Sequence, residues 1–253
     1  MTQTITGKTQ ICAVIGDPVE HSLSPCMHNA AFVSEQLDYA YVAFHVKNIK
    51  QAVEGVLGFS LRGLSVTIPH KVDIIPYLDT ISPLADKIGA VNTVVNDNGS
   101  LIGTNTDAHG ALQSIEEWEK VDNKVVTILG VGGAARAVAF AVACERKPKQ
   151  VYFLYRQEDE EMARSLTTDI QPHTSSLITN RIMEDAEIQD IIPESDIVVN
   201  TTPVGMYPNV DACLIPEKSF SEKHLVFDII YNPAKTQLLK RAENRGARII
   251  NGI

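Results

Sequence analysis

The chain lacks any long hydrophobic run. Of its 253 residues 44% are hydrophobic, yet no stretch approaches the roughly 18 apolar residues that a membrane-spanning helix requires. The opening MTQTITGKTQ has no apolar signal segment, so we expect no secretory signal and a cytoplasmic location. Basic side chains are also few, 22 against 31 acidic ones, and the net charge of -9 repels phosphate backbones and anionic lipid. The sequence therefore predicts a globular protein that binds neither nucleic acid nor membranes.

Cysteine is scarce and widely spaced. The four cysteines are Cys12, Cys26, Cys144 and Cys213, and none forms a CxxC pair. The seven histidines show no HxxxH spacing. We expect reduced, mostly buried thiols and no metal site, with a structural zinc site as the disfavoured alternative.

Short β-branched runs alternate with helix-length amphipathic segments along the chain, which is typical of an α/β protein with a parallel sheet. In the first half we expect strands over 11–15, 39–46 and 64–68 and helices over 24–37 and after Asn48. We also expect a hairpin in which 91–95 pairs with 101–103 across the turn Asn96-Asp97-Asn98-Gly99. A polar connector follows the helix expected over 107–118, and we place a domain boundary near residue 106.

The second half reads as a doubly wound domain. Its expected strands cover 125–129, 151–155, 197–200, 225–229 and 248–250, and its expected helices 133–144, 159–170 and 233–244. The predicted organisation is therefore a first domain over 1–106 and a dinucleotide-binding domain over 107–253.

A glycine cluster indicates a nucleotide site. Gly130, Gly132 and Gly133 lie between a β-branched strand and an alanine-rich helix, where pyrophosphate can approach backbone N–H groups at the positive end of the helix. The pattern departs from GxGxxG, because Ala135 holds its last position. Arg136, on the first helical turn, is either a phosphate ligand or a solvated surface arginine.

The next strand ends at Arg156, the position at which such domains select their cofactor. An arginine there accommodates the 2'-phosphate of NADP, whereas a carboxylate binds the 2'-hydroxyl of NAD. Glu158, Asp159, Glu160 and Glu161 follow directly, and their field opposes a phosphate unless they form a solvated first helical turn. The residues favour NADP and leave NAD as the alternative.

Polar residues also follow the strands of the first half. They are Ser22, Ser24, Thr67, Lys71, Asn92, Asn105 and Asp107. Hydroxyls, amides, a cation and a carboxylate suit a small polyhydroxylated acid, because each ligand hydroxyl needs a donor and an acceptor. Taken singly, Ser24 also reads as a helix cap, Asn92 as a turn residue and Lys71 as a surface cation.

Seven segments, in this order, resemble the shikimate dehydrogenase family: GDPVEHSLSPCMHN, SVTIPHK, GAVNT, GTNTDAHG, GVGGAAR, NTTPVGM and DIIYNPAKTQLL. The resemblance covers nearly the whole chain. It implies a mixed α/β substrate domain followed by a Rossmann-like NADP-binding domain, with the active site in the cleft between them. The implied reaction is the reversible NADP-dependent reduction of 3-dehydroshikimate to shikimate, in aromatic amino acid and chorismate biosynthesis.

The resemblance also implies roles for individual residues. Lys71 and Asp107 would form the catalytic pair, in which the lysine stabilises and protonates the developing alkoxide. The substrate carboxylate would contact Ser22 and Ser24. The ring hydroxyls would contact Thr67, Asn92 and Asp107. Tyr231 would lie near the substrate. The cofactor would contact Gly130, Gly132, Gly133, Ala134, Arg156, Thr201, Thr202, Pro203, Met206 and Gly252.

Two departures from the family pattern matter. The family commonly has Asn-Arg-Thr at the cofactor-selecting strand end with a further basic residue, where this sequence has Tyr155, Arg156, Gln157 and then Glu160. This leaves open NAD or dual cofactor use, as in quinate/shikimate dehydrogenases. The family also continues beyond position 253 into C-terminal helices that supply a substrate-binding glutamine, so we expect weaker substrate binding by the sequence as it stands.

Other classes of function are compatible with parts of the sequence. A quinate or cyclitol dehydrogenase is an alternative because a polar pocket excludes one extra hydroxyl poorly. A non-catalytic shikimate or quinate sensor fits the same scaffold, although Lys71 and Asp107 argue against it. A nucleotide-binding structural subunit is the least favoured, and the sequence is compatible with a homodimer.

Overall fold

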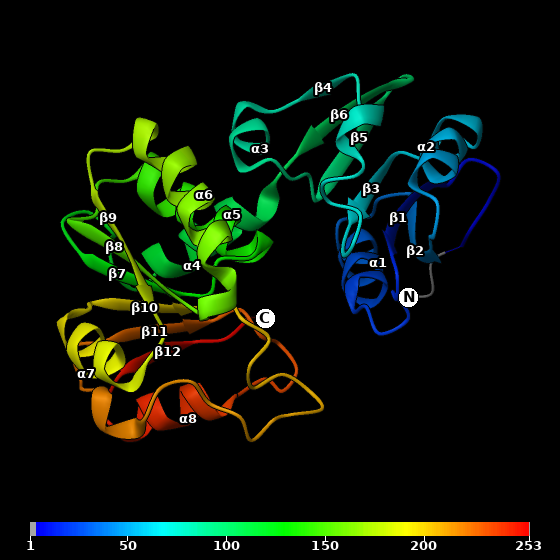
Figure 1. Ribbon diagram of the computed structural model, residues 1–253. Helices are drawn as coiled ribbons and strands as arrows, with labels where there is room; N and C mark the ends of the chain where they lie inside the picture. Colours follow the sequence, from blue (N-terminus) through cyan, green and yellow to red (C-terminus); the bar gives the residue numbers. More distant parts are fainter. Residues whose placement is uncertain (1–3, 253) are drawn as a thin grey trace. The chain divides into compact units, whose positions relative to one another are not determined.

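A computed structural model describes residues 4–252 (Figure 1). The chain divides into two compact units, unit 1 up to Thr106 and unit 2 from Asp107. Each unit is built on its own six-stranded sheet. Within the described residues, no helix combines the length and the apolar character needed to cross a bilayer.

Unit 1 has a mixed sheet with the order β2-β1-β3-β5-β6-β4. Its strands are β1 (Gln10–Gly16), β2 (Tyr39–His45), β3 (Gly63–Val66), β4 (Thr80–Ile81), β5 (Thr93–Asp97) and β6 (Ser100–Thr104). Strands β2, β1 and β3 are parallel, whereas β5 runs antiparallel to both β3 and β6. The predicted hairpin is confirmed as β5–β6, and Asn98 and Gly99 at its turn have the positive φ of 52° and 97° that a tight turn requires.

Helices cover both faces of this sheet, namely α1 (Ser24–Ser34), α2 (Ile49–Gly58) and the short α3 (Pro83–Ile88). On one face Val53 of α2 joins the core around Ile15, and on the other Phe32 of α1 packs near Tyr41. The Asn48 side chain caps α2, as predicted. Helix α1 ends at Ser34 instead of residue 37, because the chain turns into a left-handed conformation shortly after it.

Unit 2 has a fully parallel sheet. Its strands are β7 (Val125–Leu129), β8 (Gln150–Tyr155), β9 (Leu177–Ile182), β10 (Ile197–Asn200), β11 (Leu225–Asp228) and β12 (Arg248–Ile250). The spatial order β9-β8-β7-β10-β11-β12 is the 3-2-1-4-5-6 order of a Rossmann fold. The strand order reverses between β7 and β10, and ligands bind at the carboxyl ends of the strands at such a point.

The helices of unit 2 are α4 (Thr106–Glu116), α5 (Gly133–Glu145), α6 (Glu160–Ile170), α7 (Asp185–Glu194) and α8 (Gln237–Asn244). Ile192 of α7 and Leu239 of α8 belong to one buried core with Val198 of β10, while α5 and α6 lie on the opposite face of the sheet (Figure 1). Helix α8 begins at Gln237 and not at 233, because Thr236 is extended and caps it.

Two strands, β4 and β9, and two α-helices, α3 and α7, escaped the sequence reasoning. Strand β9 lies at the edge of its sheet and reads LITNRI, which lacks a continuous apolar run. Helix α7 carries Pro193 near its end, a residue that normally argues against a helix.

Candidate active site

Three of the predicted polar residues of unit 1 are brought together at the carboxyl end of β3. The backbone N–H of Thr67 donates to the carbonyl of Ile15, at 2.9 Å, and that of Val91 donates to the carbonyl of Lys71, at 2.8 Å. The carbonyl of Asn92 accepts from Val66, at 2.7 Å. Strand pairing and turn bonds therefore place Thr67, Lys71 and Asn92 at one edge of the sheet.

Asn92 is held in one orientation. It is 8% exposed, and its Oδ1 accepts the backbone N–H of Thr106 at 2.8 Å while its Nδ2 donates to Oγ1 of Thr106 at 3.0 Å. The hydroxyl of Thr93 also donates to Oδ1, at 2.9 Å. Asp107 follows Thr106 directly at the start of α4, and it is the first residue of unit 2. The pairing of Lys71 with Asp107 stays a prediction.

Ser22 and Ser24 lie in and directly after the loop that follows β1. Gly16, at the end of β1, packs so closely on the chain after β3 that an added Cβ would lie 2.5 Å from Cγ2 of Thr67. The N–H of Ser24 donates to Oγ of Ser22, at 3.3 Å. The interpretation of Ser24 as a helix cap is wrong, because Leu23 occupies the cap position of α1 and no side chain caps it.

In unit 2, the predicted cofactor residues follow the carboxyl ends of neighbouring strands. In the sheet register Leu129 of β7 pairs with Leu154 of β8 on one side and with Asn200 of β10 on the other, and Asn200 pairs with Asp228 of β11. These strand ends are therefore level. The residues that follow them, Gly130, Arg156, Thr201 and Tyr231, lie along one edge of the sheet.

The glycine loop leaves open space at the start of α5. Gly130 has φ of +95°, and a Cβ there would lie 2.9 Å from Cγ2 of Thr202. Gly132, which caps α5, and Gly133 have open space where a Cβ would stand. An anion can therefore approach the N–H groups at the start of this 13-residue helix, next to Ala134.

A cavity of about 390 Å³ opens beside this loop. Its lining consists of the loop, the first turn of α5 and one face of α6, namely Val131, Gly132, Gly133, Arg136, Glu161, Met162, Ser165 and Leu166. Arg136 donates to Oδ2 of Asp169 at 2.7 Å, and its guanidinium carbon lies 5.1 Å from the ring centroid of Phe140. Arg136 therefore links α5 to α6, in a role that neither sequence interpretation anticipated.

Arg156 is exposed but bonded to its own neighbours. Its Nε donates to Asp159 Oδ2 at 2.9 Å, and its Nη1 lies 3.2 Å from Glu158 Oε1. The hydrogen bond to Asp159 and the field of both carboxylates raise the pKa of this guanidinium above its usual range. Glu160 pairs instead with Arg164, at 2.6 Å. Part of the acidic run is thus engaged by arginines rather than by solvent alone.

A buried polar network, which sequence reasoning missed, supports this edge. Asp228 is fully buried; Oδ2 accepts the Thr236 hydroxyl at 2.6 Å, and Oδ1 accepts Nδ2 of Asn200 at 3.0 Å and the N–H of Ile230 at 3.1 Å. Burial raises the pKa of Asp228. Oδ1 of Asn200 in turn accepts the Thr202 hydroxyl, at 2.7 Å. The available signal was that Asn200 and Asp228 each end an apolar strand.

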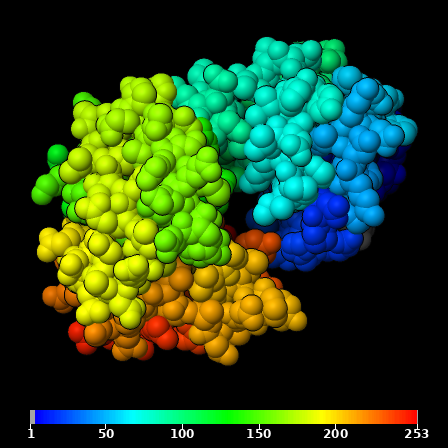
Figure 2. All heavy atoms as spheres, in the orientation of Figure 1, coloured from blue at the N-terminus to red at the C-terminus, as the bar shows by residue number. Residues whose placement is uncertain are grey.

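The predicted nicotinamide residues differ in how freely they can contact a ligand. The hydroxyl of Thr201 donates to the carbonyl of Leu129 at 2.6 Å, so its proton is committed to β7. Met206 is 44% exposed and Tyr231 42% exposed. The segment that carries Met206, drawn in gold, lies at the surface of unit 2 in Figure 2. Met206 and Tyr231 are therefore available for a ligand.

Gly252 allows close approach of two chain segments. A Cβ at this position would lie 2.1 Å from the carbonyl oxygen of Ile229, and the N–H of Gly252 donates to the carbonyl of Ile230 at 3.2 Å. Any other residue would push the chain after β12 away from the chain after β11.

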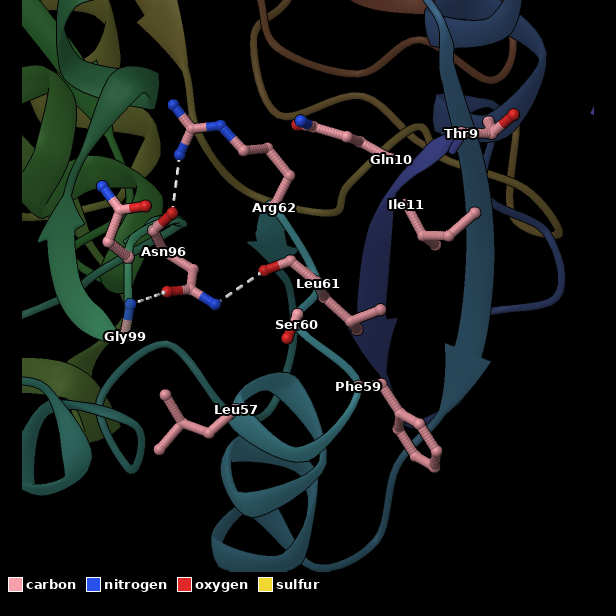
Figure 3. A pocket seen from close by; sticks show the side chains of 11 residues that line it. Thr9, Gln10, Ile11, Leu57, Phe59, Ser60, Leu61, Arg62, Asn96 and Gly99 are labelled. Carbon is pink, nitrogen blue, oxygen red and sulfur yellow. Dashed lines mark hydrogen bonds between the residues drawn. The ribbon is translucent and has the colours of Figure 1, made fainter. Parts of the chain in front are cut away.

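The predicted residues do not line every hollow in the structure. A cavity of about 620 Å³ lies where β1 and β3 begin, at the far end of these strands from Thr67, and none of the predicted site residues lines it. In this cavity Arg62 donates to the carbonyl of Asn96, at 2.7 Å (Figure 3).

Within residues 4–252 no group of three or more His, Cys, Asp or Glu side chains is arranged to hold a metal ion. The four cysteines are free thiols.

Comparisons with known proteins show which family this chain resembles. A family profile described as the shikimate dehydrogenase substrate binding domain matches residues 14–94. A shikimate dehydrogenase (NADP(+)) of Desulforamulus reducens is 42% identical over 264 aligned residues, which cover 98% of this chain and 86% of the relative.

Two solved structures are also similar. Shikimate 5-dehydrogenase from Listeria monocytogenes, in complex with shikimate and NAD, has a TM-score of 0.93 and 38% identity, covering 100% of this chain and 89% of its own. Shikimate 5-dehydrogenase from Thermus thermophilus, in complex with NADP(H) and shikimate, has a TM-score of 0.83 and 32% identity, covering 96% of this chain and 87% of its own.

Proposed function

Because the chain belongs to the shikimate dehydrogenase family, we infer that it catalyses the reversible NADP-dependent reduction of 3-dehydroshikimate to shikimate. It is an oxidoreductase of aromatic amino acid biosynthesis. The observation that carries this conclusion is identity above 40% with NADP-dependent shikimate dehydrogenases along 98% of the chain. A glycine loop at the switch point of a Rossmann sheet supports it from the structure.

We propose that NADP binds along the carboxyl edge of unit 2. Gly130, Gly132, Gly133 and Ala134 would hold the pyrophosphate, because the open space at Gly132 and Gly133 admits it to the start of α5. Arg156 would contact the 2'-phosphate of the adenosine ribose, in place of part of its bonding to Asp159 and Glu158. Around the nicotinamide we place Thr201, Thr202, Pro203, Met206 and Gly252.

We propose that unit 1 binds the substrate. Ser22 and Ser24 would bind its carboxylate, and Thr67 and Asn92 would bind its ring hydroxyls, joined by Asp107 and Tyr231 from unit 2. Asn92 suits this role because Thr93 and Thr106 already fix its amide, so little rotational freedom is lost on binding. The family profile that matches residues 14–94 also supports this proposal, since it describes a substrate binding domain.

Proton transfer is assigned to Lys71. Bound NADPH supplies the hydride that reduces the substrate carbonyl. As negative charge develops on the carbonyl oxygen, the Lys71 ammonium stabilises it and donates a proton to it. Asp107 is proposed to orient the lysine and to bind a ring hydroxyl. In the direction of shikimate oxidation, Lys71 would take the proton from the hydroxyl.

The direct test is a spectrophotometric assay at 340 nm of shikimate or quinate oxidation with NADP or NAD, in all four combinations. We expect shikimate with NADP to give the highest kcat/KM. Activity with neither substrate, despite correct folding by circular dichroism, would contradict the proposal.

NAD use is the second candidate. The observation in its favour is that Asp159 and Glu158 already bind the guanidinium that the 2'-phosphate needs. A kcat/KM for NAD equal to or above that for NADP in the same assay would support this alternative.

A cytoplasmic location and a homodimeric assembly stay predictions. Cell fractionation tests the first, and sedimentation velocity of the purified protein tests the second.

A further inference from the structure

His45 ends β2 beside the loop that leads to Ser22 and Ser24. In the parallel pairing of β1 with β2, His45 is opposite Gly16, the residue before that loop. Its Nε2 lies 2.6 Å from Oδ1 of Asp17, and its Nδ1 lies 3.5 Å from Oε1 of Glu20. One imidazole thus bridges two carboxylates of the same loop.

The two carboxylates determine which form of the ring satisfies both contacts. An ionised carboxylate only accepts hydrogen bonds, so both contacts are attractive only when both ring nitrogens carry a hydrogen. Glu20 is ionised at neutral pH: bonds from its own N–H and that of Val19, with smaller contributions from the nearby His45 and His21, hold its pKa below the usual range. A ring that carries a hydrogen on each nitrogen would therefore serve both carboxylates.

The charges of these groups matter for the ligand expected at the loop. Ser22 and Ser24 offer neutral hydroxyls to a substrate carboxylate, yet Asp17 and Glu20 add two negative charges to the same short segment. Without a neighbouring cation these charges would repel the substrate. His45 fastens the loop to β2, and its protonated form would offset one of these charges.

We propose that His45 is a positioning residue for substrate binding: through Asp17 and Glu20 it holds the loop that presents Ser22 and Ser24 and lowers its negative charge. The proposal rests on the proposed function, since it presumes an anionic substrate at these serines. It predicts that replacing His45 weakens substrate binding but changes neither the rate of the chemical step nor the affinity for the cofactor.

The test is the variant His45→Gln, which keeps a side-chain N–H but cannot carry charge. We expect KM for shikimate to rise about three- to ten-fold, as expected for the loss of one partly screened charge near the ligand. The kcat and the KM for NADP should stay within about two-fold. His173→Gln, an exposed histidine of unit 2, is the matched control and should change none of these values.

A second variant separates charge from general disruption of the loop. Adding Asp17→Asn to His45→Gln removes one carboxylate as well as the imidazole and should restore at least half of the lost substrate affinity. If His45 only supported the loop structurally, the double variant would bind substrate more weakly than His45→Gln alone. Shikimate binding measured by calorimetry without cofactor should follow the same order.

The outcomes of the two proposals are distinguishable. If the wild-type chain neither binds nor oxidises shikimate, the proposed function fails. If the wild type is active while His45→Gln leaves KM unchanged, lowers kcat as much as it raises KM, or is not rescued by Asp17→Asn, only the role of His45 is overturned.

Discussion

At the residue scale, the site depends on side chains whose partners restrict what they can do. Asn92 is committed to Thr93 and Thr106, and the carbonyl of Lys71 is bonded to Val91. Arg156 is shared with two carboxylates. Proton transfer can therefore be tested at Lys71, and cofactor choice can be tested separately at Arg156.

Replacement of Lys71 by Ala should lower kcat for shikimate oxidation by about 10²- to 10⁴-fold, because the group that exchanges a proton with the substrate oxygen is lost. The Kd for NADP, measured by calorimetry, should change less than about two-fold. Turnover at the wild-type rate would contradict the assignment. Lys47→Ala, at another lysine of unit 1 that the site does not use, is the control.

Replacement of Arg156 by Ala should raise the Kd for NADP by at least about ten-fold and leave that for NAD nearly unchanged, because only NADP carries the 2'-phosphate. Asp159→Asn is the matched variant: it releases the guanidinium from its nearest carboxylate and should tighten NADP. Equal losses for both cofactors in Arg156→Ala would show that Arg156 does not read the 2'-phosphate.

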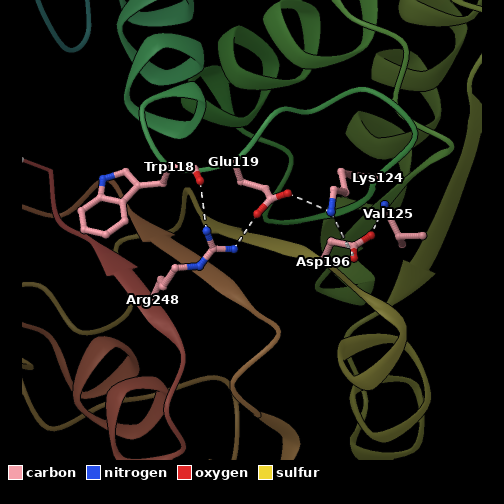
Figure 4. A network of polar contacts seen from close by, with 6 residues as sticks. All are labelled: Trp118, Glu119, Lys124, Val125, Asp196 and Arg248. Atoms are coloured by element: carbon pink, nitrogen blue, oxygen red, sulfur yellow. Dashed lines mark hydrogen bonds and ion pairs between the residues drawn. The ribbon is translucent and has the colours of Figure 1, made fainter.

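At the element scale, a polar network joins the connector after α4 to two strands of unit 2 (Figure 4). Glu119 lies 2.9 Å from Nζ of Lys124, just before β7, and 2.6 Å from Nη2 of Arg248 in β12. Arg248 also donates to the carbonyl of Trp118, at 3.0 Å. The hydrogen bonds from Lys124 and then Arg248 hold the pKa of Glu119 below its usual range.

A carboxyl whose pKa is lowered by folding stabilises the folded state above its unfolded pKa, and this contribution is lost as pH falls through the folded value. Glu119→Gln should therefore lower the free energy of unfolding by about 1 kcal/mol at pH 7. In urea titrations the difference from wild type should shrink as pH falls below about 4. The exposed Glu117→Gln is the control, and a difference that persists at low pH would contradict the charge argument.

The chain after β12 approaches the chain after β11 closely at Gly252, and this contact can be tested by substitution. Gly252→Ala should displace the chain from Ile229 and lower the free energy of unfolding by about 1 to 3 kcal/mol, because backbone cannot yield as a side-chain tip can. Thermal unfolding measures the loss. Gly133→Ala, which meets open space, should cost little stability, and an equal loss at both positions would contradict the steric argument.

At the scale of the whole molecule, the two units are proposed to bind different ligands. Shikimate alone should slow amide hydrogen exchange in segments 17–24 and 67–71, whereas NADP alone should slow it in 130–136 and 201–206. Mass spectrometry of exchanged peptides measures both patterns. Protection of 130–136 by shikimate alone, or of 17–24 by NADP alone, would contradict the division of roles.

The sequence by itself determined what short-range chemistry controls. The β5–β6 turn follows from Asn98 and Gly99, the start of α2 from Asn48, and the glycine loop from its place between an apolar strand and an alanine-rich helix. The family also followed from motifs in order. These signals are readable because each depends on neighbouring residues alone.

The tertiary structure decided what depends on residues far apart in the sequence. Strand β9 is a strand because β8 supplies its hydrogen bonds, and α7 is a helix because Ile192 is buried in the core of unit 2. The partners of Asp228, the bond from Arg136 to Asp169 and the bridge from His45 to Asp17 each need a fold that brings separate segments together. No local pattern encodes those distances, since they arise only when the sheet within each unit has formed and its loops are fixed.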